Sequence, residues 1–270
     1  MTRLLSHSLL VILSFIFLLP FGWIASLAFK RQIDILMTNI ISPISYGNFI
    51  KLFASKESTF SNDILNSLFI GLNSTFIVLV VCSLASFTLT RLKIEKWVGI
   101  IIFGWVLVFH MIPPITFIGS WFVLANSLGL FNSYSALIIA HATINLPLGL
   151  FIITNYMKEI PDEIQEAAVI DGASNYQTYF KIFLPLLLPG LFTAGIIIFL
   201  FSWNDFMVSI NLSAKATQTV PVSVATYAQQ YEVRYGEMAA GSLVSLVPGL
   251  LLTIFANRYI VRGITAGSVK

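Results

Sequence analysis

The longest uncharged stretch of the sequence runs from Trp97 to Met157 and contains no Asp, Glu, Lys or Arg. About 20 apolar residues suffice for a helix to cross the hydrocarbon core of a bilayer, so this stretch is too long for one span and suits two. Residues that form turns gather between positions 113 and 134. We therefore expect two membrane spans, residues 98–117 and 135–157, joined by a connector apolar enough to lie along the membrane interface.

Composition extends this membrane assignment to the whole chain. The 270 residues are 57% hydrophobic and 10% charged, whereas soluble domains carry about 25% charged residues. We expect an all-α polytopic membrane protein that forms one transmembrane domain, residues 1–270, with six transmembrane helices. The expected spans are residues 8–29, 65–89, 98–117, 135–157, 186–212 and 238–260.

The first apolar run, from Leu4 to Phe29, has a competing interpretation as a cleaved signal peptide. Ser26-Leu27-Ala28 places small residues as at a cleavage site. However, Arg3 is the only charge before the run, and the run is longer than the ~7–15 apolar residues of a typical signal peptide. We expect the segment to be retained as the first span.

The distribution of Lys and Arg gives the expected orientation. Short loops rich in these residues face the cytoplasm, and the loop of residues 91–96 after the second span has three basic side chains and one acidic. Six spans then place both termini, and the segment of residues 158–185, in the cytoplasm. Lys30-Arg31, directly after the first span, opposes this orientation. The formal net charge of +3 fits basic loops and indicates no nucleic-acid partner.

The segment of residues 158–185 has strong helix signals although it lies between spans. Pro161 suits the first position of a helix, and two acidic residues follow in the first turn. Gly172 suits the left-handed position after a helix, and Ser174 with Gln177 forms a capping box that opens a second helix, which we expect to stop before Pro185. Because ordinary cytoplasmic loops are short and basic, we interpret this helix pair as a docking element for a soluble partner.

The spacing within this segment resembles the EAA loop of ABC importer permeases. The matching residues are Glu166-Ala167-Ala168, Asp171-Gly172-Ala173, Phe180 and Ile182-Phe183-Leu184-Pro185. Other stretches resemble the carbohydrate branch of these permeases, of the maltose-transporter type and specifically its six-span subunit. They are Leu65-Asn66-Ser67-Leu68, Ser127-Leu128-Gly129-Leu130-Phe131-Asn132, Trp203-Asn204-Asp205-Phe206 and the tail from Gly263 to Lys270.

This resemblance implies a type I ABC importer permease fold in the cytoplasmic (inner) membrane of a prokaryote. It implies import of a sugar or oligosaccharide by alternating access, with the 158–185 segment as a coupling helix pair. The implied partners are a homologous second permease, two ABC ATPase subunits and an extracytoplasmic solute-binding protein. ATP and Mg would be bound by the ATPases. The chain itself has no Gly-Lys pair and hence no Walker A loop, so we expect no cofactor on it and no enzyme activity.

The resemblance also assigns roles within the segment. Glu166 makes the charged contact with the ATPase, and Ala167 and Ala168 allow close packing. Asp171, Gly172 and Ala173 complete the docking set, with Gly172 permitting the bend.

Six polar or aromatic residues in or near the spans are candidates for the substrate pathway. They are Trp203, Asn204, Asp205, His110, His141 and Asn145. The Trp-Asn-Asp cluster suits sugar hydroxyls, or else caps a helix end beside an interfacial tryptophan. The histidines either line the pathway or hydrogen-bond neighbouring helices, and packing is the commoner role. The sequence shows no Cys/His cluster with the spacing of a metal site.

Three alternatives remain beside a sugar permease. One is a permease for glycerol phosphate or another polyol-like solute in the same superfamily. A second is a secondary transporter driven by an ion gradient, which the scarcity of ionisable residues in the spans disfavours. An intramembrane enzyme is disfavoured further, because no constellation of nucleophile and base is present.

Overall fold

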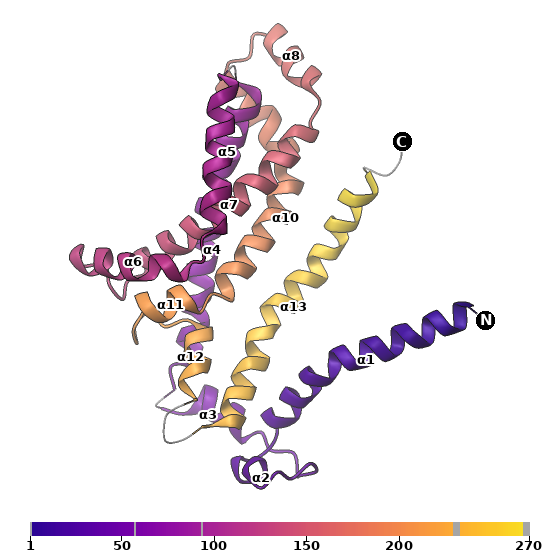
Figure 1. Ribbon diagram of the computed structural model, residues 1–270, viewed down its shortest axis with the longest axis vertical. Helices are drawn as coiled ribbons and strands as arrows, with labels where there is room; N and C mark the ends of the chain where they lie inside the picture. The colour runs from indigo at the N-terminus through magenta and orange to yellow at the C-terminus, as the bar shows by residue number, and fades with distance from the viewer. Residues whose placement is uncertain (1, 57, 93, 229–232, 267–270) are drawn as a thin grey trace. The chain divides into compact units, whose positions relative to one another are not determined.

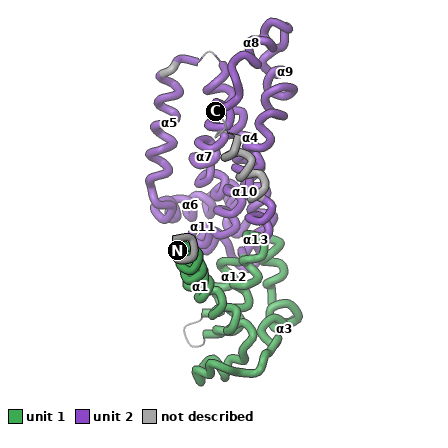
Figure 2. Tube along the Cα trace, turned by 90° about the vertical axis from the view of Figure 1, so that its right-hand side faces the viewer, with its two compact units in different colours: residues 1–65, 220–250 green, residues 66–219, 251–270 purple. Residues whose placement is uncertain are grey.

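The computed structural model describes residues 2–56, 58–92, 94–228 and 233–266, and these residues are almost entirely helical (Figure 1). The tail that the resemblance includes lies partly outside them, at 267–270. Two compact units are present: residues 1–65 with 220–250, and residues 66–219 with 251–270 (Figure 2). The helices are α1 (Thr2–Ala28), α2 (Gln32–Leu36), α3 (Gly47–Ala54), α4 (Phe60–Arg91), α5 (Lys96–Met111), α6 (Ile115–Ser127), α7 (Tyr134–Glu159), α8 (Asp162–Ile170), α9 (Asn175–Gln177), the π-helix η1 (Thr178–Phe183), α10 (Leu184–Trp203), α11 (Met207–Leu212), α12 (Val220–Thr226) and α13 (Tyr235–Ala266).

Length and composition identify five candidate membrane spans among the described residues. They are Ser6–Ala28, Phe60–Arg91, Tyr134–Glu159, Asn175–Trp203 and Tyr235–Phe255. A sixth arises if the bent pair α5 and α6 counts as one span. Most of these helices start or end several residues away from the boundaries expected from hydropathy.

The expected third span, residues 98–117, is not one continuous helix. Helix α5 ends at Met111, and the chain turns by 96° before α6 begins at Ile115. Pro113 and Pro114 cause the break, because proline has no backbone N–H to donate and restricts the residue before it. Most of the expected connector is therefore the helix α6.

The expected fifth span, residues 186–212, differs at both ends. The second helix of the 158–185 segment does not stop before Pro185: α9, η1 and α10 form one helical run, Asn175–Trp203. The π-helical segment rearranges the backbone hydrogen bonds just before the proline, so the helix continues through it. At the other end α10 stops at Trp203, and α11 is a separate short helix that begins at Met207.

Unit 2, residues 66–219 with 251–270, packs α7 against α4, α5 and α10. Its apolar core includes Val78 of α4, Ile153 of α7 and Phe183 and Ile198 of the run that forms α10. A Cβ added at Gly149 of α7 would lie 2.5 Å from Val78 Cγ1, so the helices approach closely because this residue is a glycine. Figure 1 shows α8 beyond one end of α5, α7 and α10.

Unit 1, residues 1–65 with 220–250, is held by polar contacts beyond the end of α1. The side-chain amide of Asn48 donates to the carbonyls of Ala28 (2.9 Å) and Lys30 (2.8 Å). Lys51 Nζ pairs with Glu237 Oε1 at 3.1 Å. The most apolar window of α1 is 0% buried.

Candidate functional site

The turn between α8 and α9 is closed by backbone bonds. Gly172 has a φ of +73°, in the left-handed region that favours glycine. Its N–H donates to the carbonyl of Val169 (3.1 Å), and the N–H of Ala173 donates to the carbonyl of Ala168 (2.9 Å). These two bonds form the Schellman motif that ends many helices, with Asp171 as the C-cap. The expected left-handed conformation of Gly172 after the helix is confirmed.

The capping box is also confirmed. Ser174 Oγ accepts the N–H of Gln177 (3.3 Å), and Gln177 Oε1 accepts the N–H of Ser174 (2.9 Å). The bend is thus held by backbone bonds and the start of the second helix by side chains, all between residues close together in the chain, 168–177.

Helix α8 has an inner and an outer face. Glu166 and Ala167 are exposed, whereas Ala168 is buried by other parts of this chain. Of the Glu-Ala-Ala triplet, only the first two side chains therefore point outward. Three large exposed side chains complete the outer surface, and sequence reasoning missed them. They are Val169, Ile170 (85% exposed) and Tyr176, which we call the tip patch.

Arg91, the last residue of α4, is buried beneath α8. Its guanidinium forms an ion pair with Asp162 in the first turn of α8, and its side chain is 3% exposed. Nη2 donates to the carbonyls of Met157 and Ile160 at the end of α7. The guanidinium also lies 5.1 Å from the ring centroid of Phe183 in η1, within cation–π distance. One side chain thus contacts α8, η1 and the end of α7.

Gln165 adds a second link between α8 and the end of α4, since its Nε2 donates to the backbone carbonyl of Arg91 at 2.6 Å. The Arg91 cluster is Arg91, Met157, Ile160, Asp162, Gln165 and Phe183. Sequence reasoning counted Arg91 only as a charge in a basic loop.

Two more residues of α4 contact the same segment. Ser83 Oγ lies 2.8 Å from the hydroxyl of Tyr179 in η1. The Phe87 ring lies 5.2 Å from that of Tyr179 and 5.4 Å from that of Phe183, measured between centroids. Ser83, Phe87 and Arg91 are spaced by four residues and so share one helix face, which we call the α4 stripe. This spacing is the signal that could have identified Arg91 from the sequence.

A second buried polar group lies around His141 of α7. His141 Nδ1 is 2.6 Å from Ser202 Oγ, and Nε2 is 3.2 Å from Ser209 Oγ and 3.3 Å from Asp205 Oδ1. Ser202 Oγ in turn lies 3.1 Å from Ser74 Oγ. These five residues are the His141 cluster. They connect α4, α7, α10 and α11, which is the helix-packing role weighed for His141.

Asp205 caps the first turn of α11. Its Oδ1 accepts the backbone N–H groups of Val208 (3.2 Å) and Ser209 (3.0 Å), and the Ser209 hydroxyl (3.2 Å). This geometry is the helix-cap alternative weighed from the sequence. The Asp205 side chain is 20% exposed, so the residue is partly accessible.

The other pathway candidates are divided between interior and surface. Trp203 is buried, and Asn145 is buried with its amide donating to the carbonyl of His141 (2.9 Å). Asn204 is exposed, and its amide donates to the carbonyl of Leu200 (2.9 Å). His110 is exposed on α5 and is not part of the His141 cluster. The structure thus joins His141 with Asp205 and leaves His110 apart.

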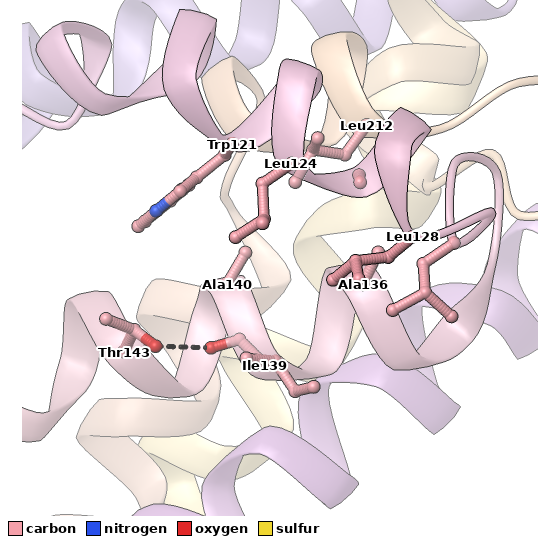
Figure 3. A pocket seen from close by; sticks show the side chains of 10 residues that line it. Trp121, Leu124, Leu128, Ala136, Ile139, Ala140, Thr143 and Leu212 are labelled. Atoms are coloured by element: carbon pink, nitrogen blue, oxygen red, sulfur yellow. Dashed lines mark hydrogen bonds between the residues drawn. The ribbon is translucent and has the colours of Figure 1, made fainter.

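His110 lines a cavity of about 420 Å³ between α5 and α7. Its walls are mostly apolar, with Phe103 and Phe151 among them, and Lys158 lies among its polar residues. A smaller cavity of about 160 Å³ lies between α6, α7 and α11 (Figure 3). Trp121, Leu124 and Leu212 line it. The hydroxyl of Thr143, which also lines it, donates a hydrogen bond to the carbonyl of Ile139 at 2.8 Å. This apolar lining is a poor match for a polyhydroxylated solute.

Comparison with known proteins identifies the family. A family model described as a binding-protein-dependent transport system inner membrane component matches residues 83–265, which include the whole 158–185 segment. The chain belongs to this family.

Individual relatives agree with this membership. The chain is 34% identical to the trehalose transport system permease protein SugB of Mycobacterium tuberculosis, over 94% of this chain and 92% of that protein. It is 30% identical to the trehalose/maltose transport system permease protein MalG of Thermococcus litoralis, over 96% and 94% of the two chains. The chain is therefore a permease component of an ABC transporter, as expected, and not an enzyme.

Solved structures show the same fold. The chain is similar to a bacterial ABC transporter involved in import of the acidic polysaccharide alginate, with a TM-score of 0.77, 18% identity and 96% coverage of each chain. It is also similar to the MetNI methionine transporter, with a TM-score of 0.60 and 18% identity over 76% of this chain and 95% of that one. The expected all-α, type I ABC importer permease fold is confirmed.

Proposed function

We propose that this permease imports a sugar or oligosaccharide across the cytoplasmic membrane of a prokaryote by alternating access. It pairs with a homologous second permease, receives solute from an extracytoplasmic binding protein and is driven by two ABC ATPases that bind ATP and Mg. Both termini and the 158–185 segment, called the coupling segment below, face the cytoplasm. The names of the relatives, which transport trehalose and maltose, support the substrate class.

The observation that carries the proposal is the outer surface of the coupling segment. Val169, Ile170 and Tyr176 are large apolar side chains left exposed on a bend whose backbone is internally closed. Exposed large apolar side chains on a structured element favour a protein partner, because burying them gains about 25 cal/mol per Å². Glu166 is exposed on the same helix and supplies the charged contact.

For the solute pathway we propose roles that follow from exposure. Asn204, Asp205 and His110 have accessible polar groups and contact solute hydroxyls during transport. His141, Asn145 and Trp203 are buried and hold the helices that form the pathway. Replacing Asn204 with Ala then raises the solute concentration needed for half-maximal uptake, whereas replacing His141 lowers the amount of folded complex.

The test uses the complete transporter in vesicles, with the binding protein outside and ATP inside. Uptake of radiolabelled trehalose, maltose and glycerol phosphate is measured for the wild type, Glu166→Ala, Gly172→Leu and the control Thr88→Val. Thr88 lies on an exposed face of α4 and bonds only to the Leu84 carbonyl of its own helix in the contacts described. We expect ATP-dependent sugar uptake that both coupling-segment variants abolish, together with weaker co-purification of the ATPases.

Other outcomes separate the alternatives. Normal transport by both coupling-segment variants contradicts the docking role. Preference for glycerol phosphate over the disaccharides supports the polyol alternative. Uptake by this chain alone in vesicles without ATP supports a secondary transporter instead.

A further inference from the structure

We propose that Arg91 is the residue through which movement of the coupling segment reaches the transmembrane helices. It is a positioning residue that holds the first turn of α8 to the end of α4 and to the start of the α10 run. The proposal rests on the proposed function, because it assumes that ATPases move α8.

Four elements meet at Arg91: α4, the end of α7, α8 and η1. Its guanidinium contacts Asp162 of α8, the last carbonyls of α7 and the Phe183 ring of η1, while its backbone belongs to α4. A helix C-terminus has carbonyls without intrahelical partners, and a buried cation satisfies them and interacts favourably with the helix dipole. Arg91 therefore acts as the cap of α7 although it belongs to another helix.

The two residues of the Arg91–Asp162 ion pair differ in exposure. The Arg91 side chain is 3% exposed, whereas that of Asp162 is 87% exposed. An ion pair with one exposed partner is weak by itself, so the carbonyls and Phe183 fix Arg91 in place. Asp162 is the part of the pair that can be removed without disturbing this anchor, and removing it loosens α8 from a site that stays intact.

Helix α8 has two polar contacts with Arg91, which we call its ties. Asp162 holds the guanidinium, and Gln165 Nε2 holds the Arg91 backbone carbonyl at 2.6 Å. They lie three residues apart and so face the same side of α8. With both in place α8 cannot slide or turn without moving the end of α4. The tip patch lies on other positions of the segment, so docking and transmission use different side chains.

The contacts between α4 and η1 continue along α4 beyond Arg91. Phe87 and Ser83 follow Arg91 on the α4 stripe and contact Phe183 and Tyr179 of η1. The end of α4 and the start of the α10 run therefore form one packed unit with α8 attached to it by Arg91. A displacement of α8 by an ATPase moves both helices together.

The experiment uses the complete transporter, purified and returned to vesicles. The main variant combines Asp162→Ala with Gln165→Leu, which removes the acceptor of the first tie and the donor of the second. The companions are Asp162→Glu, which keeps a carboxylate, Arg91→Lys, which keeps the charge without the planar fork, and the control Thr88→Val. Two quantities are measured: the amount of ATPase that co-purifies and the solute imported per ATP hydrolysed.

We expect the double variant to retain wild-type ATPase co-purification and ATP hydrolysis while solute imported per ATP falls about tenfold, within the usual range of coupling between sites. Asp162→Glu, which keeps Gln165, retains most of the wild-type ratio of solute imported to ATP hydrolysed. Arg91→Lys gives a ratio between those of the wild type and the double variant. An unchanged ratio in the double variant overturns the proposal. So does a loss of co-purified ATPase in proportion to lost uptake, since the ties would then only shape the docking surface.

The wild type distinguishes failure of the proposed function. If wild-type protein binds no ATPase or imports solute without ATP, the assumption that ATPases move α8 is wrong. If the wild type behaves as proposed and only the variant ratios stay constant, the inference about Arg91 alone is wrong.

Discussion

The run that forms α10 has a buried polar cluster at each end, and the two clusters are built differently. The Arg91 cluster, beside η1, contains a permanent charge and depends on one side chain for most of its bonds. The His141 cluster, at the far end, shares its bonds among hydroxyls, an imidazole and a carboxylate that has three other donors. One cluster has a single central residue, and the other is distributed.

This difference indicates which end transmits force. In the His141 cluster Ser74, Asp205 and Ser209 each have another partner within their own helix or turn, so the helices can shift relative to each other at small cost. In the Arg91 cluster a shift separates a buried cation from its acceptors, which is costly. The end of α10 near the coupling segment should therefore move as a rigid body, and the other end should adjust. The following predictions, in order of decreasing effect on stability, test this contrast.

Replacing Arg91 with Leu should have the largest effect. It leaves the carbonyls of Met157 and Ile160 without their donor, and each unpaired buried group costs about 1–3 kcal/mol. We expect a clear fall in the thermal unfolding midpoint of the detergent-purified permease and loss of uptake. Thr88→Val is the control, and an unchanged midpoint would show that Arg91 is not the centre of its cluster.

Replacing His141 with Leu should cost less, about 1 kcal/mol, because intramembrane hydrogen bonds average about 0.6 kcal/mol. Asp205 keeps the N–H groups of Val208 and Ser209, and Ser74 keeps its bond to the carbonyl of Gly71 (3.1 Å). The same unfolding measurement should give a smaller shift than for Arg91→Leu. A larger shift would reverse the contrast between the two ends.

Tyr179→Phe should have a smaller effect still. It removes the hydroxyl that lies 2.8 Å from Ser83 Oγ and keeps the ring beside Phe87, so we expect a loss of about 0.6 kcal/mol. A double-mutant cycle with Ser83→Ala measures the contact directly. If the two single changes add without any coupling energy, the hydroxyls do not interact and the α4 stripe is only an apolar contact.

Ile170→Ser should leave stability within about 0.5 kcal/mol, since surface substitutions outside a packed region usually do. The side chain is 85% exposed at the end of α8. Co-purification of the ATPases should fall severalfold, measured on protein with a wild-type unfolding midpoint. Equal co-purification would mean that the tip patch is not the docking surface.

The features that were predictable from the sequence are the ones with local causes. The left-handed position of Gly172 and the capping box of Ser174 and Gln177 depend on neighbouring residues, and both were predicted. The presence of the membrane-spanning helices was also predictable, from the lengths of the uncharged stretches. Membership of the family followed from the spacing of motifs in the coupling segment and elsewhere.

What was missed depends on contacts between distant residues. Hydropathy averaged over the stretch does not separate α10 from α11, because the break at Asn204 and Asp205 is only a few residues long and lies between apolar residues. It also cannot show that Arg91 is buried, since that depends on carbonyls of α7 folding back over it. The exposure of Ile170 and the burial of Ala168 could have been read from the helical period, given that Ile164 and Ala168 lie on one face.

The π-helical segment η1 has a consequence for how such chains can vary. A π-helix accommodates one residue more than the α-helix that would cover the same path, and η1 lies between the tip patch and the whole of α10. Each residue of an α-helix turns the chain by about 100°. Deleting one residue within Thr178–Phe183 would therefore leave an ordinary α-helix over the same path, whereas deleting one residue within α10 would rotate the tip by that angle about the helix axis. In this helical run η1 is therefore the place where the chain can lose one residue without changing the direction in which α8 and the tip patch point.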